Sequence, residues 1–365
     1  MNQRAGISLL QLFIIYISTA FGAGILSLPR AVGTVAKEDM WLSVFLASLV
    51  MGFSLWCAIT LSERFPEVTL IEYHRLLLGP LGGQLLNICY VLILVILGAA
   101  ALHMFTSAVK LFLFDLTPPY ILVVGLLVTA AYAGQYGIAP LIRMQQFMVF
   151  YVGPFYITLV LSGFLRMDST HLQPFLASGI IPVLKGVVPG AFAYTGPELV
   201  TGLLFPFVTR KKQVFKTGLY STAMLAVLYT VITVIVQGAL GPDEINVTTF
   251  PTITAYREVD IPGTFIERMD GYLLIVQIIF YFLSLANLLY FSAFGCSRLL
   301  QGEYSRPFVV LLIPVFFFVV TLPQNAEQIN HFYRLGNYLA LTWGVLILPG
   351  LLLIAKLRNL YGSKS

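Results

Sequence analysis

The sequence predicts an all-α polytopic membrane protein whose ten transmembrane helices form a 5+5 inverted repeat. Composition, the number of apolar runs and two interruptions within those runs predict this class. Of the 365 residues, 58% are hydrophobic and only 10% are charged, and the mean hydropathy is +0.89. A soluble domain carries about 25% charged residues. These values therefore exclude a soluble protein and leave no room for a separate soluble domain, so residues 1–365 are expected to form one transmembrane domain.

Ten apolar runs are long enough to span a membrane, which requires about 20 mostly apolar residues. They lie near 7–30, 40–62, 83–113, 119–138, 145–165, 180–206, 213–239, 270–296, 306–323 and 336–356. The first five runs form repeat one, about 7–165, and the second five form repeat two, about 180–356. The one long outer loop is 241–266. Its residues 252–259 suit one or two helical turns, which would act as a lid, a surface loop or a docking face.

Lys and Arg residues predict the orientation of the chain. With the N-terminus inside, thirteen of the 21 basic residues lie in or near inner loops and eight on the outer side. Cytoplasmic loops carry the excess of Lys and Arg, so both termini are expected in the cytoplasm. The basic cluster 210–212 is the strongest signal. Because the basic residues lie between membrane spans, they do not indicate nucleic-acid binding.

The first run contains the first interruption, at residues 21–30, which read FGAGILSLPR. A glycine inside a helix costs roughly 1 kcal/mol relative to alanine, and two of them a residue apart favour unwinding. Unwound backbone inside a membrane needs partners from protein or ligand. Close helix packing is the alternative use of such glycines. The ligand-binding candidates in this run are Phe21, Gly22, Ala23, Gly24 and Ile25.

The sixth run contains the second interruption, at residues 189–198, which read PGAFAYTGPE. The proline of a Gly-Pro pair removes a backbone donor and predicts a break. Tyr194, Thr195 and Gly196 are the ligand-binding candidates here. Glu198 is the only acidic residue well inside any run, and an intramembrane carboxylate marks a functional site. We expect a gating or proton-linked role for Glu198; alternatively, it only bonds the free amides of the break.

Interruptions in the first run of each half are typical of an inverted-repeat transporter fold with its site at the midplane. The half-helix after Gly24 would present its N-terminal amides to an anion. The carbonyls before Gly22 and near Tyr194 would face a cation. A free amino acid carries both charges. The third and eighth runs are expected to supply the walls of the site, with packing as the alternative role, through Ile93, Leu97, Ser284 and Leu288.

No enzyme signature is present in the sequence. It contains no phosphate-binding loop, no metal-binding HExxH motif and no complete dinucleotide fingerprint. We therefore expect no catalytic activity, no cofactor and no metal site.

Several segments together resemble the spore-germination B subunits, the GerAB-type permeases of the amino acid–polyamine–organocation superfamily, which have a LeuT-like fold. The matching segments are 21–31, 196–198, 206–212, 250–253 and 265–268. They are spread along the whole chain, and the chain length and number of spans also agree. Gly22 and Gly24 match the family's glycines in the first span, and Glu198 matches its acidic residue in the sixth.

The resemblance implies a subunit of a nutrient germinant receptor in the inner membrane of a bacterial endospore. It also implies two partners, an A subunit and a lipoprotein C subunit. We therefore expect a nutrient, an amino acid by the charge argument above, to bind between the two breaks and trigger germination. One alternative is a proton-coupled amino acid transporter of the same fold, with Glu198 carrying the proton. Another is a channel-forming subunit that binds no nutrient.

Overall fold

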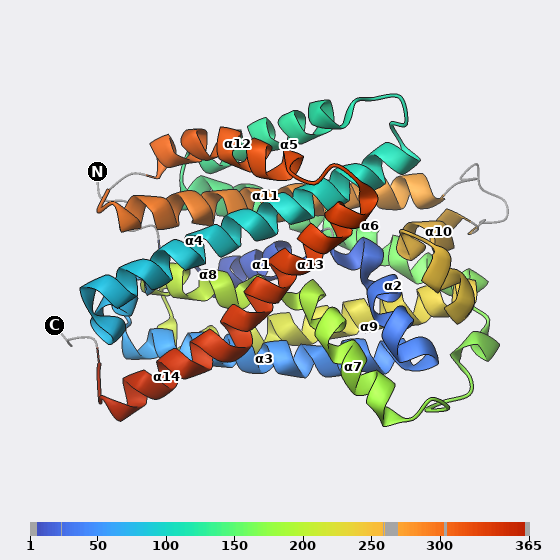
Figure 1. Cartoon of the computed structure of the whole chain (residues 1–365), viewed down its shortest axis with the longest axis horizontal. Coiled ribbons are helices and arrows are strands. Elements are labelled where there is room, and N and C mark those ends of the chain that lie inside the picture. Colours follow the sequence, from blue (N-terminus) through green and yellow to red (C-terminus); the bar gives the residue numbers. More distant parts are fainter. Residues whose placement is uncertain (1–5, 23, 258, 260–268, 303–304, 362–365) are drawn as a thin grey trace.

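The computed structural model describes residues 6–22, 24–257, 259, 269–302 and 305–361, and within these ranges the chain is almost entirely helical (Figure 1). The elements of the first half are α1 (Leu9–Ala20), α2 (Gly24–Ala36), η1 (Lys37–Asp39), α3 (Met40–Arg64), α4 (Leu70–Phe112), α5 (Pro119–Gly134), α6 (Ile138–Ser162), η2 (Gly163–Arg166) and η3 (Ser169–Leu172). The only β contact in the described ranges is an isolated bridge between Ile7 and Val208.

The second half follows the same all-helical plan. Its elements are α7 (Ile180–Ala191), η4 (Phe192–Tyr194), α8 (Pro197–Leu204), η5 (Phe205–Phe207), η6 (Lys211–Gln213), α9 (Val214–Val247), α10 (Pro251–Arg257), α11 (Met269–Leu299), α12 (Arg306–Thr321), α13 (Ala326–Thr342), the π-helical turn η7 (Trp343–Ile347) and α14 (Leu348–Leu357).

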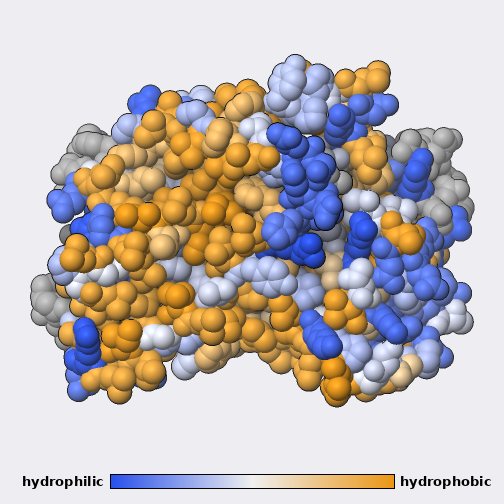
Figure 2. Space-filling model, viewed as in Figure 1, coloured by the Kyte–Doolittle hydropathy of each residue, from blue (hydrophilic) through white to orange (hydrophobic). Residues whose placement is uncertain are grey.

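Six helical stretches in the described ranges are long and apolar enough to cross a membrane. They are Gly24–Arg64, Leu70–Phe112, Ile138–Arg166, Lys211–Val247, Met269–Leu299 and Glu327–Leu357, and five shorter apolar helices accompany them. Large apolar side chains also cover much of the surface (Figure 2), for example Leu92, Phe150 and Leu353. An apolar surface of this extent is unusual for a soluble protein. The chain is therefore a multi-pass membrane protein.

Helices α1, α8 and α11 form the buried centre of the molecule. Helix α1 packs against α6, α9 and α11, and α11 also packs against α4 and α5. Helix α3 packs against α7, α8 and α9 on the other side. In Figure 1, α1 and α8 accordingly lie behind α4 and α13 near the middle of the bundle. Ile15, Tyr16 and Ser18 of α1 are completely buried.

Both predicted helix interruptions are present. Helix α1 ends at Ala20, the Gly22 N–H donates to Ala20 O at 2.9 Å, and α2 begins at Gly24. In the second interruption, the 3₁₀ turn η4 leads to Gly196, whose φ of 135° and ψ of −58° suit only glycine. Pro197 then starts α8 at the first helical position, where its missing N–H costs nothing.

Two further Gly-Pro pairs interrupt α4 and α9 with a kink. Gly79 in α4 and Gly241 in α9 have φ values of 77° and 74°, and each precedes a proline at which the helix resumes. The segment 241–266, expected to be a loop, therefore begins as helix and continues to Val247. The short helix expected within residues 252–259 is present as α10.

Candidate functional site

The two interruptions lie against each other in the centre of the molecule. A methyl group built on Gly24 would lie 3.5 Å from Cα of Ala193, in the turn before the second break. One built on Gly196 would lie 2.9 Å from Cγ2 of Thr19, near the end of α1. The chain thus brings together segments almost 180 residues apart in the sequence, and glycine permits their close approach.

The carbonyl groups at the end of α1 are hydrogen-bonded by other helices. The last carbonyls of a helix have no partner within it. Three carbonyls near the break accept side-chain hydrogen bonds: Thr19 O from Ser284 Oγ at 2.9 Å, Ala20 O from Tyr229 OH at 3.1 Å and Gly22 O from Gln277 Nε2 at 3.1 Å. The sequence interpretation assigned carbonyls of this kind to a cation. In the structure, polar side chains of α9 and α11 occupy these positions.

Ser284 is the eighth-run candidate that lies directly at the first break. Its Oγ would be 3.1 Å from a methyl group on Gly22. Ser284 is buried, as are Phe21 and Ile25 on either side of the break. Ala23, another candidate, lies outside the described residues. Two polar side chains of α11, Ser284 and Gln277, therefore point at the interruption of the first run.

A buried cluster of four polar side chains fastens α1 to α6 and α11 one turn before the break. The Asn287 amide donates to Ser18 Oγ at 3.0 Å and to Thr19 Oγ1 at 2.9 Å, and it accepts from the Gln145 amide. Ser18 Oγ in turn donates to Gln145 Oε1 at 2.8 Å. Gln145 carried no signal in the sequence, because it stands next to Gln146 at the start of the fifth apolar run, where polar residues are expected at the end of a membrane span.

The second break is held by local hydrogen bonds. Thr195 Oγ1 donates to Phe192 O at 2.9 Å, and Tyr194 OH donates to a carbonyl of α3 at 3.1 Å. The Gly196 N–H lies 3.2 Å from both carboxylate oxygens of Glu198. Glu198, with 1% of its surface exposed, therefore bonds a free amide of the break, which is the structural role considered as the alternative.

Glu198 lies beside the π-helical turn η7 and close to Ser54 of α3. A methyl group on Gly344, in the π-helical turn η7, would lie 3.4 Å from Cγ of Glu198 and still closer to Oγ of Ser54. Four buried polar atoms in this region have no hydrogen-bond partner among the described residues: Ser54 Oγ, Tyr73 OH, His74 Nε2 and Trp343 Nε1. Buried polar atoms without a hydrogen-bond partner are rare in native proteins, so these four atoms mark a candidate polar site. None of the four residues was predicted from the sequence.

The predicted wall residues of the third and eighth runs lie at helix–helix contacts. Leu97 in α4 faces α13, where its Cα would be 3.4 Å from a methyl group on Gly336. Leu288 in α11 faces α4, where its Cβ would be 3.3 Å from a methyl group on Gly98. Ile93 is also buried. These contacts are of the packing kind, and a ligand-binding role for the three residues stays a prediction.

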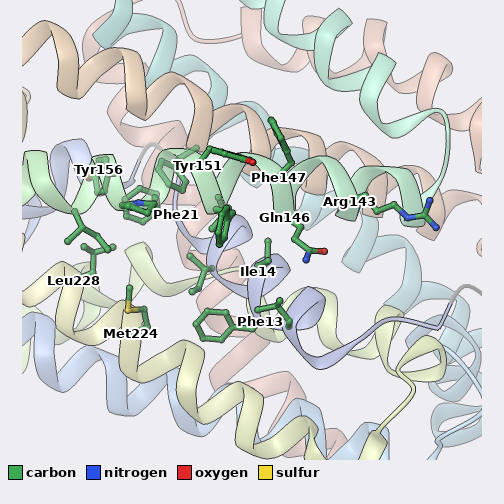
Figure 3. A pocket seen from close by; sticks show the side chains of 18 residues that line it. Phe13, Ile14, Phe21, Arg143, Gln146, Phe147, Tyr151, Tyr156, Met224 and Leu228 are labelled. Carbon is green, nitrogen blue, oxygen red and sulfur yellow. The ribbon is translucent and has the colours of Figure 1, made fainter.

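An apolar groove of about 710 Å³ adjoins the first break (Figure 3). Its walls come from α1, α6 and α9, for example Ile14, Tyr151 and Leu228. Phe21, at the end of α1, closes the groove toward the break. The Phe21 ring contacts the ring of Tyr156 edge-on, with centroids 5.1 Å apart, and also packs against rings of α9 and α11.

A second cavity, of about 620 Å³, lies between α2, α7 and α13. Ser27 and Phe192, from the segments that adjoin the two breaks, line it, as does Tyr333 of α13. The Tyr333 hydroxyl would be 3.1 Å from a methyl group on Gly24. The Tyr333 side chain therefore lies between this cavity and the first break.

Comparison with known proteins identifies the relatives of this chain. Residues 6–329 match the family described as "Spore germination protein". The chain is 27% identical to Spore germination protein YndE of Bacillus subtilis (strain 168) over 358 residues, 97% of each chain. It is 27% identical to Spore germination protein A2 of the same organism over 86% of this chain and 85% of the relative. For Spore germination protein B2, the identity is 25% over 91% and 90%. The chain therefore belongs to the spore germination protein family.

Proposed function

We propose that this protein is the nutrient-sensing membrane subunit of a spore germinant receptor, and that an amino acid binds between the two helix breaks to trigger germination. The observation that carries the proposal is the contact between the breaks, where Gly24 adjoins Ala193 and Gly196 adjoins Thr19 in the buried centre. Broken helices that meet at midplane are the usual binding site of inverted-repeat transporters. The relatives named above are spore germination proteins, which favours a sensor in germination.

The proposed topology has ten membrane crossings in two inverted halves. Helices α1 and α2 together make the first crossing, α7 and α8 the sixth, and α13 and α14 the tenth. The halves, residues about 7–165 and 180–356, then each begin with a broken helix. Both termini face the cytoplasm, and the membrane is the inner membrane of the spore. The A subunit and the C lipoprotein of the receptor are the proposed partners.

The proposed site holds the two charged groups of an amino acid at different helix ends. The first amides of α2 would bind the carboxylate, because a helix N-terminus attracts anions. The carbonyls of Thr19 and Gly22 would bind the ammonium through their second lone pairs, whereas Ala20 O already accepts hydrogen bonds from the Gly22 N–H and from Tyr229 OH. The proposed contacts are Phe21, Gly22, Ala23, Gly24, Ile25, Ile93, Leu97, Tyr194, Thr195, Gly196, Ser284 and Leu288.

The breaks are closely packed, so ligand entry requires movement. Tyr333 is the proposed gate, because its side chain lies between the 620 Å³ cavity and Gly24. Rotation of this one ring away from α2 would connect the cavity to the break. Binding would favour the opened arrangement, since a ligand shifts an equilibrium by its differential affinity for the two states.

A proton-coupled amino acid transporter is the second candidate. The observation that favours it is the buried Glu198 carboxylate close to Ser54 Oγ, a buried atom that has no hydrogen-bond partner among the described residues. Purified protein in liposomes separates the two functions. A transporter would accumulate a labelled amino acid against its gradient, whereas a sensor would bind it saturably without accumulation.

Ligand-dependent thermal stabilisation of the purified full-length protein tests the proposed site. A panel of twenty amino acids is screened against wild type, Gly22→Leu and Gly125→Leu. Gly125 is the matched control because a methyl group there would meet no atom within 4 Å. At least one amino acid should stabilise wild type and Gly125→Leu but not Gly22→Leu. Equal stabilisation of Gly22→Leu would refute binding at the breaks.

A further inference from the structure

Three basic side chains from three different helices line the 620 Å³ cavity. They are Arg30 of α2, Lys185 of α7 and Arg334 of α13. Ser27, Asn330 and Tyr333 add neutral hydrogen-bonding groups, and none of the described residues that line the cavity is acidic. We call these six residues the outer vestibule. Figure 2 shows a hydrophilic strip that interrupts the apolar surface where α13 begins.

The positive charges of the outer vestibule are not neutralised within the described part of the chain. The ion pairs found there join Lys211 to Glu67 and Arg298 to Glu72, and none involves Arg30, Lys185 or Arg334. A concave site lined by charge of one sign concentrates counter-ions. The positive charge of the cavity therefore favours the binding of anions.

The position of the vestibule also needs an explanation. In the proposed topology it opens on the outer side, where Lys and Arg are depleted relative to the cytoplasmic loops. Three of the eight basic residues assigned to that side nevertheless gather in this one cavity. Its volume of about 620 Å³ lies within the usual range for small-molecule sites, roughly 300–1,000 Å³.

We infer that the outer vestibule is a capture site for carboxylate-bearing small molecules, which it holds before they pass Tyr333 to the breaks. The two guanidinium groups offer bidentate hydrogen bonds that match a carboxylate, and the Lys185 ammonium adds a third positive charge. Tyr333, which lines this site, also lies against Gly24 at the first break. The capture role deepens the proposed function and rests on it only for the ligand's final destination.

Sodium acetate is the probe that tests the vestibule without knowledge of the nutrient. Purified full-length protein in neutral-lipid nanodiscs is titrated with acetate against chloride at constant ionic strength, and thermal unfolding is followed. Acetate should raise the Tm of wild type by a few degrees and should not raise that of the double variant R334Q/K185Q. Lys110→Gln, which removes an outer positive charge away from the cavity, is the control and should respond like wild type.

The possible outcomes separate the sources of the anion. No acetate effect on wild type, or an equal effect on the double variant, would overturn the inference. Loss of the acetate effect when anionic phospholipid replaces neutral lipid would assign the site to a lipid headgroup and also overturn it. Once the amino acid screen has identified a ligand, R334Q should weaken its binding about three- to tenfold and reduce its salt dependence.

The experiments can refute the capture site without refuting the proposed function, and the proposed function without refuting the capture site. A wild-type response to acetate with no stabilisation by any amino acid would keep the carboxylate site and remove the nutrient site. If Gly22→Leu abolishes amino acid binding but R334Q/K185Q leaves it unchanged, the nutrient site is supported and the carboxylate site is refuted.

Discussion

Gly196 gives the second break its shape, because its backbone conformation is one that only glycine adopts readily. Its φ of 135° is unfavourable for any side chain, and a methyl group would also press on Thr19. Gly196→Ala should therefore lower the free energy of unfolding by about 1–3 kcal/mol or more. Thermal unfolding of the purified variant measures this loss. Gly125→Ala, in an open helical position, should be neutral or slightly stabilising, and equal stability of the two variants would contradict the description of the break.

Glu198 acts on the same break as an acceptor of the Gly196 N–H. Glu198→Ala would leave that amide unpaired in the interior, at a cost of about 1–3 kcal/mol. Glu198→Gln keeps a side-chain oxygen that can accept the bond and should lose less. Thermal unfolding of both variants checks the order. Equal losses would show that charge, rather than the hydrogen bond, matters for stability.

At the scale of single residues, the sequence predicts more of the breaks than of their surroundings. Gly22, Gly24 and Gly196 could be identified because glycine next to glycine or proline is costly inside an apolar run. Tyr333 and Gln145 could not, since their roles depend on which helices become neighbours. No local sequence pattern indicates that Tyr333 of α13 contacts Gly24 at the start of α2.

At the scale of elements, the cluster of Gln145 and Asn287 connects α6 and α11 to the end of α1. Because the two amides contact each other, the effects of Gln145→Ala and Asn287→Ala on unfolding should not add, with a coupling of about 1 kcal/mol. A double-mutant cycle measures this term. As a control, Gln145→Ala combined with Thr129→Ala should be additive, because Thr129 bonds only within α5. Zero coupling between Gln145 and Asn287 would contradict a structural role for the cluster.

The helix ends were partly predictable. The short helical segment 70–78 at the start of α4 is separated from the third apolar run by the non-helical Gly79, and the run matches the part of α4 that resumes at Pro80. In α9, likewise, a short helical segment resumes at Pro242 after the non-helical Gly241. The π-helical turn η7 has no sequence signature at all, although it brings Gly344 next to Glu198.

At the scale of the whole molecule, the orientation follows from charge and can be tested by labelling. In a background with the three cysteines replaced by serine, Asp115→Cys should react with a membrane-impermeant thiol reagent added outside intact cells. Gln301→Cys should react only after permeabilisation, since the proposed topology places it in the cytoplasm. The reverse labelling pattern would invert the topology and place the basic vestibule on the inner side.

The relation between the two halves connects the fold to sensing. In the proposed topology each half begins with a broken helix, and because the two breaks lie against each other in the centre, a ligand there would contact both halves at once. Such a ligand can shift the halves relative to each other only if it binds one arrangement more tightly. The gate proposed at Tyr333 and the carboxylate capture site are two steps of one entry route.

The nutrient response of spores that carry Gly22→Leu tests the central claim most directly. The variant is compared with Gly125→Leu and wild type at matched amounts of the protein in the spore membrane. Leucine at position 22 would project toward Ser284, which bonds Thr19 O at the end of α1, and would obstruct the first break. The response to the nutrient should disappear in Gly22→Leu spores and persist in Gly125→Leu spores. A normal response of Gly22→Leu spores would contradict nutrient binding at the helix breaks.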